Sequence, residues 1–232
     1  MKTLIASALA LVVLFASALS VPQAPKEAPN EAPKAAPVSA AENAEILRTQ
    51  KPAYPLTKCV ASGRELDAKA IDIVLDGRLV RLCCGDCKAT ADKDKAAWIA
   101  KIDAAVIAAQ KPTYPLDTCP ISSQKLGSKG DPIDVVSGTK LVRLCCKGCI
   151  PAYEKDVATV MAKVDKAWIE AQVATYPLDT CVVSDEKLDS MGGVVDVLYG
   201  TKLIRLCCKG CQKTVEKEGA ALVAKIEAAR KK

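Results

Sequence analysis

Hydrophobic positions recur along the chain in three stretches that share one pattern. Each stretch starts at a Tyr-Pro-Leu segment and continues with two short apolar runs separated by a turn. The starts are 60 and 62 residues apart and lie at Tyr54, Tyr114 and Tyr176. The expected turn pairs are Asp76-Gly77, Ser137-Gly138 and Tyr199-Gly200. Asp-Gly between β-rich runs is a strong hairpin signal, so strands are expected over 71–75 and 79–82 and at the same places in the later repeats.

A longer run with helical spacing follows each predicted hairpin. Apolar residues three and four positions apart mark these runs, as in an amphipathic helix. They are Ile102, Val106 and Ile107, then Val160, Val164 and Ile169, then Leu222, Val223 and Ile226. Trp98 and Trp168 lie on the first two helices, where core or inter-module packing is expected. The fold class is therefore predicted as α+β, built from three tandem ββα modules, with a shorter lead-in helix over 41–50.

The segment before the repeats has a different character. Lys2 precedes an apolar run from Leu4 to Leu19, and Ala18-Leu19-Ser20 suits a signal peptidase. The run is shorter than a comfortable membrane span, so we expect a signal peptide at 1–20 and no stable membrane insertion after cleavage. Residues 21–41 are mostly Pro, Ala, Lys and Glu, which predicts a disordered linker. This order predicts a bacterial protein that is periplasmic or secreted.

The remaining chain divides into modules 1, 2 and 3, expected at 42–110 with the lead-in helix, 111–173 and 174–232. A module of about sixty residues has a small core when aromatic residues are only 3% of the chain. Domains of this size often need disulfides or a metal to be stable. Cysteine is the residue that can either form such disulfides or bind such a metal.

All twelve cysteines follow one layout, with a single cysteine well before a Cys-Cys-x-x-Cys cluster. The groups are Cys59 with Cys83, Cys84 and Cys87; Cys119 with Cys145, Cys146 and Cys149; and Cys181 with Cys207, Cys208 and Cys211. The cluster falls where the second strand becomes a helix, and positions three or four residues apart share a helix face. A helix N-terminus also favours the thiolate. The layout predicts one treble-clef-like site per module, holding zinc or a soft metal such as copper.

Several neighbouring residues have two possible roles. The fourth-ligand role is open for Cys84, Cys146 and Cys208, because adjacent cysteines rarely both bind one metal without strain. The serines three positions after each first cysteine are poor zinc ligands: Ser62, Ser122 and Ser184. Three aspartates are either strand-end or turn carboxylates or ligands: Asp72, Asp134 and Asp196. Three arginines either stabilise thiolates or face solvent from a strand: Arg81, Arg143 and Arg205.

The cysteine spacing resembles the TRASH and YHS family of heavy-metal-binding domains. Their signature is a cysteine, about twenty residues, and Cys-x3-Cys, with an apolar strand entering the second cysteine. The first, second and fourth cysteine of each group match it. The gap here is 23, 25 and 25 residues, another cysteine follows the second family cysteine, and Ala91, Tyr153 and Val215 replace the phenylalanine near its end. The resemblance implies metal binding in sensing, trafficking or resistance.

Composition narrows the function further. The chain has no histidine, which excludes Ser-His-Asp and Cys-His catalysis and a zinc ion held by three histidines. The net charge of +6 is mild, and few aromatics are available for base stacking, so no nucleic-acid partner is expected. We expect a protein that is not an enzyme and whose partners are metal ions. The repeat surface is a candidate contact for a protein partner.

Two alternatives use the same cysteines differently. An oxidising compartment favours disulfides, so the modules could be disulfide-stabilised structural or protein-interaction repeats without metal. Loops of this size contribute roughly 3 kcal/mol per disulfide. The other alternative is thiol redox chemistry, because Cys84-Gly85-Asp86-Cys87 superficially matches a thioredoxin-like Cys-x-x-Cys. The chain lacks a thioredoxin-sized α/β pattern, which weighs against the hypothesis of thiol redox chemistry.

Overall fold

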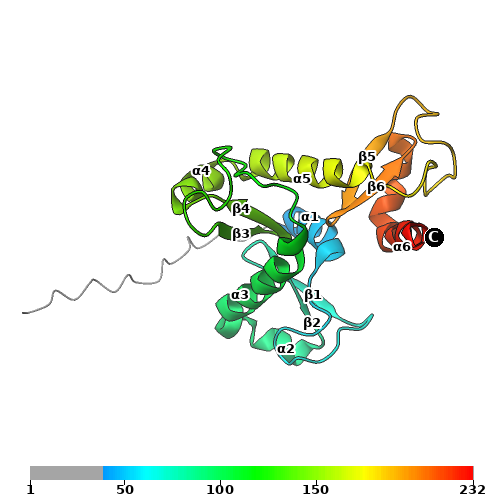
Figure 1. Cartoon of the computed structure of the whole chain (residues 1–232). Helices are drawn as coiled ribbons and strands as arrows, with labels where there is room; N and C mark the ends of the chain where they lie inside the picture. The colour runs from blue at the N-terminus through cyan, green and yellow to red at the C-terminus, as the bar shows by residue number, and fades with distance from the viewer. Residues whose placement is uncertain (1–38, 232) are drawn as a thin grey trace, which may run out of the picture. The chain divides into compact units, whose positions relative to one another are not determined.

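The structure is a computed structural model that describes residues 39–231. The predicted signal peptide 1–20 and most of the predicted linker 21–41 lie outside these residues. The described part is α+β, with short two-stranded antiparallel sheets and helices that form three similar ββα units (Figure 1). Among residues 39–231, none of the helices has both the length and the apolar character needed to cross a membrane.

The lead-in helix α1 spans Ala40–Gln50, close to the predicted range. Its start is fixed by a capping box in which Ser39 and Glu42 each accept a hydrogen bond from the other's backbone N–H. Its end passes into the 3₁₀ turn η1, Lys51–Ala53, which contains Pro52. Proline has no backbone N–H and cannot continue the helical ladder, so the chain turns here toward the first hairpin.

Each module contains one β-hairpin. The strands are β1 Ile71–Leu75 with β2 Arg78–Leu82, β3 Ile133–Ser137 with β4 Lys140–Leu144, and β5 Val195–Tyr199 with β6 Lys202–Leu206. Asp76 and Gly77 both have positive φ, 47° and 73°, as a type I′ turn requires. In the other hairpins the turn lies one residue later than predicted, at Gly138-Thr139 and Gly200-Thr201. There the glycine alone has positive φ, so the preceding Ser or Tyr can stay in the strand.

Helices follow each hairpin but begin in different ways. Module 1 has a short α2, Gly85–Ala89, and a long α3, Ala91–Gln110, followed by the 3₁₀ turn η2, Lys111–Thr113. Module 2 has the 3₁₀ turn η3, Lys147–Cys149, then α4 Ile150–Lys155 and α5 Val157–Val173. Module 3 has η4, Lys209–Cys211, and one continuous helix α6, Gln212–Arg230. The predicted change from strand to helix at the cysteine cluster is confirmed.

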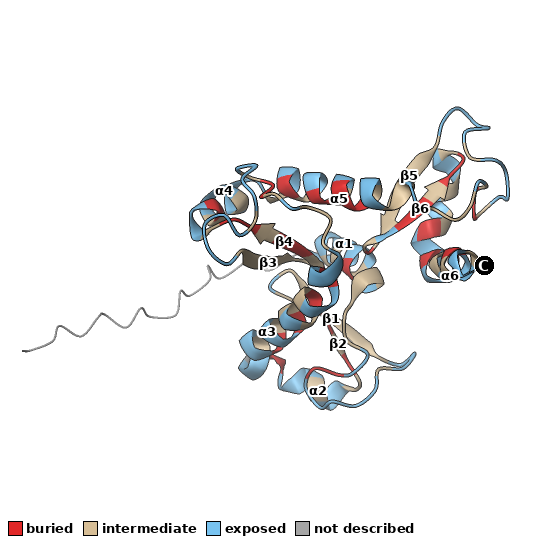
Figure 2. Cartoon of the chain, viewed as in Figure 1, coloured by how far each residue is buried: buried red, intermediate tan, exposed pale blue. Residues whose placement is uncertain are grey.

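Each module has a small apolar core between the second strand and the long helix. The long helix buries one side and exposes the other, whereas the second strand exposes no residue in module 1, where Leu79, Val80 and Leu82 are buried (Figure 2). In module 1 the core contains Val80 and Leu82 of β2 with Trp98, Ile102 and Val106 of α3. Trp168 of α5 is buried in the core of module 2 in the same way. The predicted packing role of both tryptophans is confirmed.

A glutamine near the end of each preceding helix joins it to the next hairpin. The Gln110 side chain accepts a hydrogen bond from Leu141 N at 2.8 Å and donates one to Thr139 O at 2.7 Å. Gln50 makes the same pair of bonds with Leu79 N and Gly77 O. Gln172 repeats it in module 3 with Leu203 N and Thr201 O. The hairpins are thereby held against the preceding helices by a repeated polar joint.

Candidate metal centres

The first cysteine of each group lies in a tight turn. In module 1, Cys59 N donates to Arg64 O at 2.7 Å, and Gly63 N donates to Cys59 O at 2.8 Å. The turn passes through the left-handed region at Gly63, with φ of 73°. Ser123 and Asp185 occupy this place in the other modules, each with φ of 58°. The turn buries the first cysteine: Cys59 is 1% exposed, and its counterparts Cys119 and Cys181 are equally buried.

The other three cysteines come from the end of the second strand and the turn after it. Cys83 follows β2 directly, and Cys84 is the N-cap of α2, with an extended backbone. Cys87 then lies within α2, so it returns toward Cys83 after one turn. Modules 2 and 3 use the 3₁₀ turns η3 and η4 for the same purpose. A pleated strand end followed at once by a helical turn gathers the sulfurs without a long loop.

In every module the first, second and fourth cysteine bring their sulfurs together. All Sγ atoms in each of these trios lie within 4.8 Å of one another. The trios are Cys59, Cys83 and Cys87; Cys119, Cys145 and Cys149; and Cys181, Cys207 and Cys211. The upstream cysteine, separated by more than twenty residues, therefore does meet the downstream cluster in all three modules.

The third cysteine of each group lies at the edge of its trio. Cys84 Sγ is 3.8 Å from Cys83 Sγ and 3.7 Å from Cys87 Sγ. Cys146 Sγ is 3.8 Å from Cys145 Sγ, and Cys208 Sγ is 3.8 Å from Cys211 Sγ. The third cysteine therefore lies close to one or two sulfurs of its trio, but its sulfur is not within 4.8 Å of all three.

The spacing of the sulfurs is compatible with metal binding and is too long for disulfide bonds. The closest Sγ pairs measure 3.7–3.9 Å, and all twelve cysteines, which lie within residues 39–231, are free thiols. A disulfide needs an S–S distance of about 2.05 Å. Four sulfurs placed tetrahedrally at about 2.3 Å from a zinc ion are about 3.8 Å apart. The sulfurs are spaced like ligands of one ion.

Hydrogen bonds make the first thiol of each module acidic. Burial alone raises the pKa of Cys59, but bonds from the Ser62 hydroxyl and from the backbone amides of Ser62, Cys83 and Ala61 lower it to about 6. Similar bonds outweigh burial and bring the pKa to about 6 at Cys119 and Cys181. A thiolate is the form of cysteine that binds metal, so the turn prepares one ligand in advance.

The last thiol of each module is shifted in the opposite direction. Burial, and then the neighbouring thiols, raise the pKa of Cys87 to about 12. The same causes raise the pKa to about 12 at Cys149 and Cys211. Several thiolates crowded into one partly buried space repel one another, which favours the protonated form of the last thiol. A bound cation would remove that repulsion and displace this proton.

The serine three positions after each first cysteine lies close to the second cysteine of its module. The hydroxyl of Ser62 lies 3.3 Å from Cys83 Sγ, and Ser122 and Ser184 repeat this distance to Cys145 and Cys207. These serines can donate to a ligand sulfur without binding the metal themselves.

The aspartates and arginines are paired with each other instead of with sulfur. Arg81 Nε donates to Asp72 Oδ1 at 2.7 Å, across the hairpin. Arg143 with Asp134 and Arg205 with Asp196 form the same pair at 2.8 Å. Asp72 is the second residue of β1, near the strand end, and its carboxylate is used by these ion pairs and not by the sulfur cluster. Lys51 also contacts Asp72, at 2.7 Å. These charges stabilise the hairpin and leave the sulfurs to other partners.

The arginine that does reach a sulfur was missed by the sequence reasoning. Arg64 Nη2 lies 2.9 Å from Cys84 Sγ. The equivalent residues in modules 2 and 3 are Gln124 and Glu186. Only a comparison of the repeats at the position where they differ in charge could have drawn attention to Arg64.

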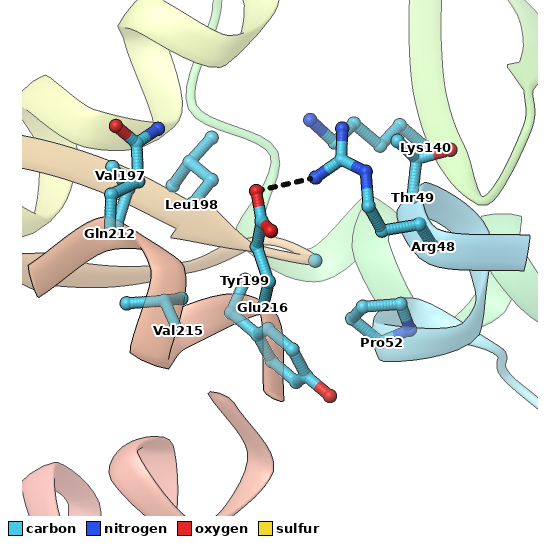
Figure 3. Close-up of a pocket in the computed structure, with 11 residues that line it drawn as sticks. Arg48, Thr49, Pro52, Lys140, Val197, Leu198, Tyr199, Gln212, Val215 and Glu216 are labelled. Atoms are coloured by element: carbon cyan, nitrogen blue, oxygen red, sulfur yellow. Dashed lines mark hydrogen bonds and ion pairs between the residues drawn. The ribbon is translucent and has the colours of Figure 1, made fainter. Parts of the chain in front are cut away.

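The cavity drawn in Figure 3 lies away from the cysteines. Arg48 and Thr49 of α1 line it on one side, and Tyr199 of β5 and Glu216 of α6 on the other. Arg48 Nη1 and Glu216 Oε1 lie 3.5 Å apart across it, as the dashed line marks. No cysteine lines this cavity.

Comparison with known proteins found no relative of this chain. No family model matches the chain, and neither a curated protein nor a solved structure matches it. The candidate metal centres are therefore supported by their geometry alone.

Proposed function

We propose that this protein binds one thiophilic metal ion in each module through cysteine sulfurs, for metal trafficking or sequestration or as structural sites. The observation that carries the proposal is the threefold recurrence of a sulfur trio with spacing of 3.7–3.9 Å between its closest members. Zinc and Cu(I) are the ions best matched by an all-sulfur ligand set. The modules are proposed to be treble-clef-like members of the TRASH/YHS type.

The third cysteine is proposed as the fourth ligand. Cys84, Cys146 and Cys208 each lie 3.7–3.8 Å from at least one member of their trio, the distance expected along a tetrahedral edge. Cys83 and Cys84 are adjacent in sequence, yet their sulfurs lie 3.8 Å apart, and the backbone at Cys84 is extended, with φ of −163° and ψ of 170°. The third sulfur would still have to move toward the rest of its trio to complete a tetrahedral set, because it is not within 4.8 Å of all three.

Metal analysis combined with thiol titration tests the proposal. The mature chain, purified from its native compartment, is expected to carry three ions, and its thiols are expected to react fully only after a strong chelator removes them. Cys83→Ser should lower the content to two ions. Cys84→Ser should keep the third ion but lower the number of sulfur neighbours seen by X-ray absorption. A chain with neither metal nor free thiols would establish the disulfide alternative instead.

The location is a separate part of the proposal. The apolar segment 4–19 and the small residues at 18–20 support export, with Val21 as the first residue of the mature chain. N-terminal sequencing of the protein recovered from periplasm or medium should begin at Val21. Recovery of the uncleaved chain from the cytoplasm would contradict this.

A further inference from the structure

The three metal centres differ at one place that the repeat otherwise keeps constant. The residue five positions after the first cysteine always accepts a backbone hydrogen bond from that cysteine, at 2.7–2.8 Å. Its backbone is thus fixed in the same position relative to each site, while its side chain changes from positive to neutral to negative. The residues are Arg64, Gln124 and Glu186.

Arg64 uses this position to contact the cluster from the solvent side. Its side chain is exposed, yet its Nη2 lies 2.9 Å from Cys84 Sγ. Among the hydrogen bonds within residues 39–231, none joins Gln124 or Glu186 to a sulfur through the side chain. At this position, in the part of the chain that the structure describes, module 1 alone places a solvent-facing cation against a sulfur; the exposed Lys147 and Lys209 of modules 2 and 3 lie between the last two cysteines instead.

The sulfurs of module 1 are also the most accessible. Cys59 is buried, but Cys83, Cys84 and Cys87 are all half-buried. In module 2 the whole trio is buried, at 1%, 0% and 7% exposed for Cys119, Cys145 and Cys149.

The residues that follow the cluster explain this difference. Ile150 and Tyr153 pack against the core that contains the module 2 trio. Exposed Lys88 stands in module 1 where Ile150 stands in module 2. The cluster of module 2 is therefore closed by apolar side chains, and that of module 1 is open.

We infer that module 1 is the exchange site of the array and that Arg64 guides anionic thiol carriers to it, whereas module 2 retains its ion. This rests on the proposed metal binding. Exchange requires an incoming thiolate to reach the ion, which the open cluster permits. An exposed cation beside the entrance raises the local concentration of an anionic partner.

The exchange step is a ligand substitution and transfers no electrons. The carrier's sulfur forms a bond to the ion as the bond to Cys84 Sγ breaks, and one thiolate replaces another. The released Cys84 thiolate is left beside the Arg64 guanidinium, 2.9 Å away. A charge-assisted hydrogen bond stabilises that anion, so Arg64 favours both the arrival of the carrier and the departure of Cys84.

Cadmium NMR on the full chain can follow each centre separately. The chain is loaded with three cadmium ions, and the signals are assigned by the loss of one signal in each of Cys83→Ser, Cys145→Ser and Cys207→Ser. An anionic dithiol, dimercaptosuccinate, is then added. The module 1 signal is expected to disappear about tenfold faster than that of module 2. Equal rates, or a slower module 1, would overturn the inference.

Variants at the equivalent position isolate the contribution of charge. Arg64→Gln copies module 2 and should slow loss from module 1 to dimercaptosuccinate at least about threefold, with weaker salt dependence. It should not change the rate with uncharged dithiothreitol, and Arg64→Lys should retain most of the speed.

The reciprocal variant is the matched control. Gln124→Arg should leave module 2 slow, because Ile150 and Tyr153 still cover its sulfurs. An Arg64→Gln rate that is unchanged with the anionic dithiol would refute the role of Arg64. Absence of all three cadmium signals in the unmodified chain would instead refute metal binding itself.

Discussion

At the scale of single residues, each candidate centre combines a prepared thiolate with hydroxyl support. The first cysteine has its pKa lowered to about 6 by hydrogen bonds, and a serine lies 3.3 Å from the second cysteine. Once the second cysteine is a thiolate it has no proton to donate, so the serine hydroxyl must be the donor. Hydrogen bonds of this kind hold a ligand sulfur in place and reduce its excess charge.

Removal of one such hydroxyl should weaken one centre without unfolding its module. Ser122→Ala leaves Cys145 Sγ without its partner at 3.3 Å, and the metal affinity of module 2 should fall about tenfold. Competition titration with a coloured chelator would measure this. Ser123→Gly is the control, because Ser123 is exposed and its φ of 58° suits glycine. Equal affinities for the two variants would show that the hydroxyl has no part in binding.

The sequence was sufficient to predict the sulfur sites but not their surroundings. Cysteine spacing repeats in all modules, so the convergence of Cys59 with Cys83 and Cys87 could be expected and is confirmed. Arg81 was considered as a thiolate partner because it lies two residues before the cluster. Side chains alternate along a strand, and a cross-strand partner, Asp72, lies opposite Arg81 in the register. Register is a pairing property that one strand's sequence does not contain.

At the scale of elements, the joint between helix and hairpin carries much of the architecture. Gln110 is only 7% exposed, and both atoms of its amide are used by the next hairpin. Sequence reasoning placed strands within one residue of their observed ends because alternation and glycine turns are local signals. It missed this joint because a glutamine at a helix end resembles any polar surface residue. A signal existed, since glutamine stands four residues before the Tyr of every repeat, at 50, 110 and 172.

Loss of this amide should therefore destabilise the chain. Gln110→Ala leaves Thr139 O and Leu141 N buried without a partner and should lower the free energy of unfolding by about 2–4 kcal/mol. Denaturant unfolding of the metal-loaded chain measures the change. Gln212→Ala removes an exposed glutamine at the start of α6 and should have little effect. If both variants unfold at the same denaturant concentration, the joint contributes nothing to stability.

At the scale of the whole described chain, the cores of neighbouring modules share residues. Leu141 belongs to the hairpin of module 2, but it is buried in the core of module 1 with Trp98 and Val106. Leu144, three residues later on the same strand, is buried in the core of module 2 itself. The two faces of β4 therefore serve two modules. Repeats that share interfaces stabilise one another, so neighbouring modules should be energetically coupled.

Two substitutions of equal size on β4 test this coupling. Leu141 and Leu144 are both 0% exposed, so Leu→Ala at either site should cost about 2–5 kcal/mol. The two substitutions should destabilise different helices. Leu141→Ala should speed amide hydrogen exchange over 98–106 of α3 in module 1, because its cavity opens beside Trp98. Leu144→Ala should speed amide hydrogen exchange over 160–168 of α5 in module 2.

The pattern of exchange decides between coupled and independent modules. Independent modules would confine both effects to module 2, because both leucines lie in its hairpin. If the modules are coupled, Leu141→Ala should also speed amide hydrogen exchange in α3 of module 1. Gln110 of this helix accepts a hydrogen bond from Leu141 N. The metal centre of module 1 would then lose affinity although the substituted residue lies outside module 1, and Leu144→Ala would leave that affinity unchanged. A transfer of this kind would show that the centres of modules 1 and 2 belong to one folding unit.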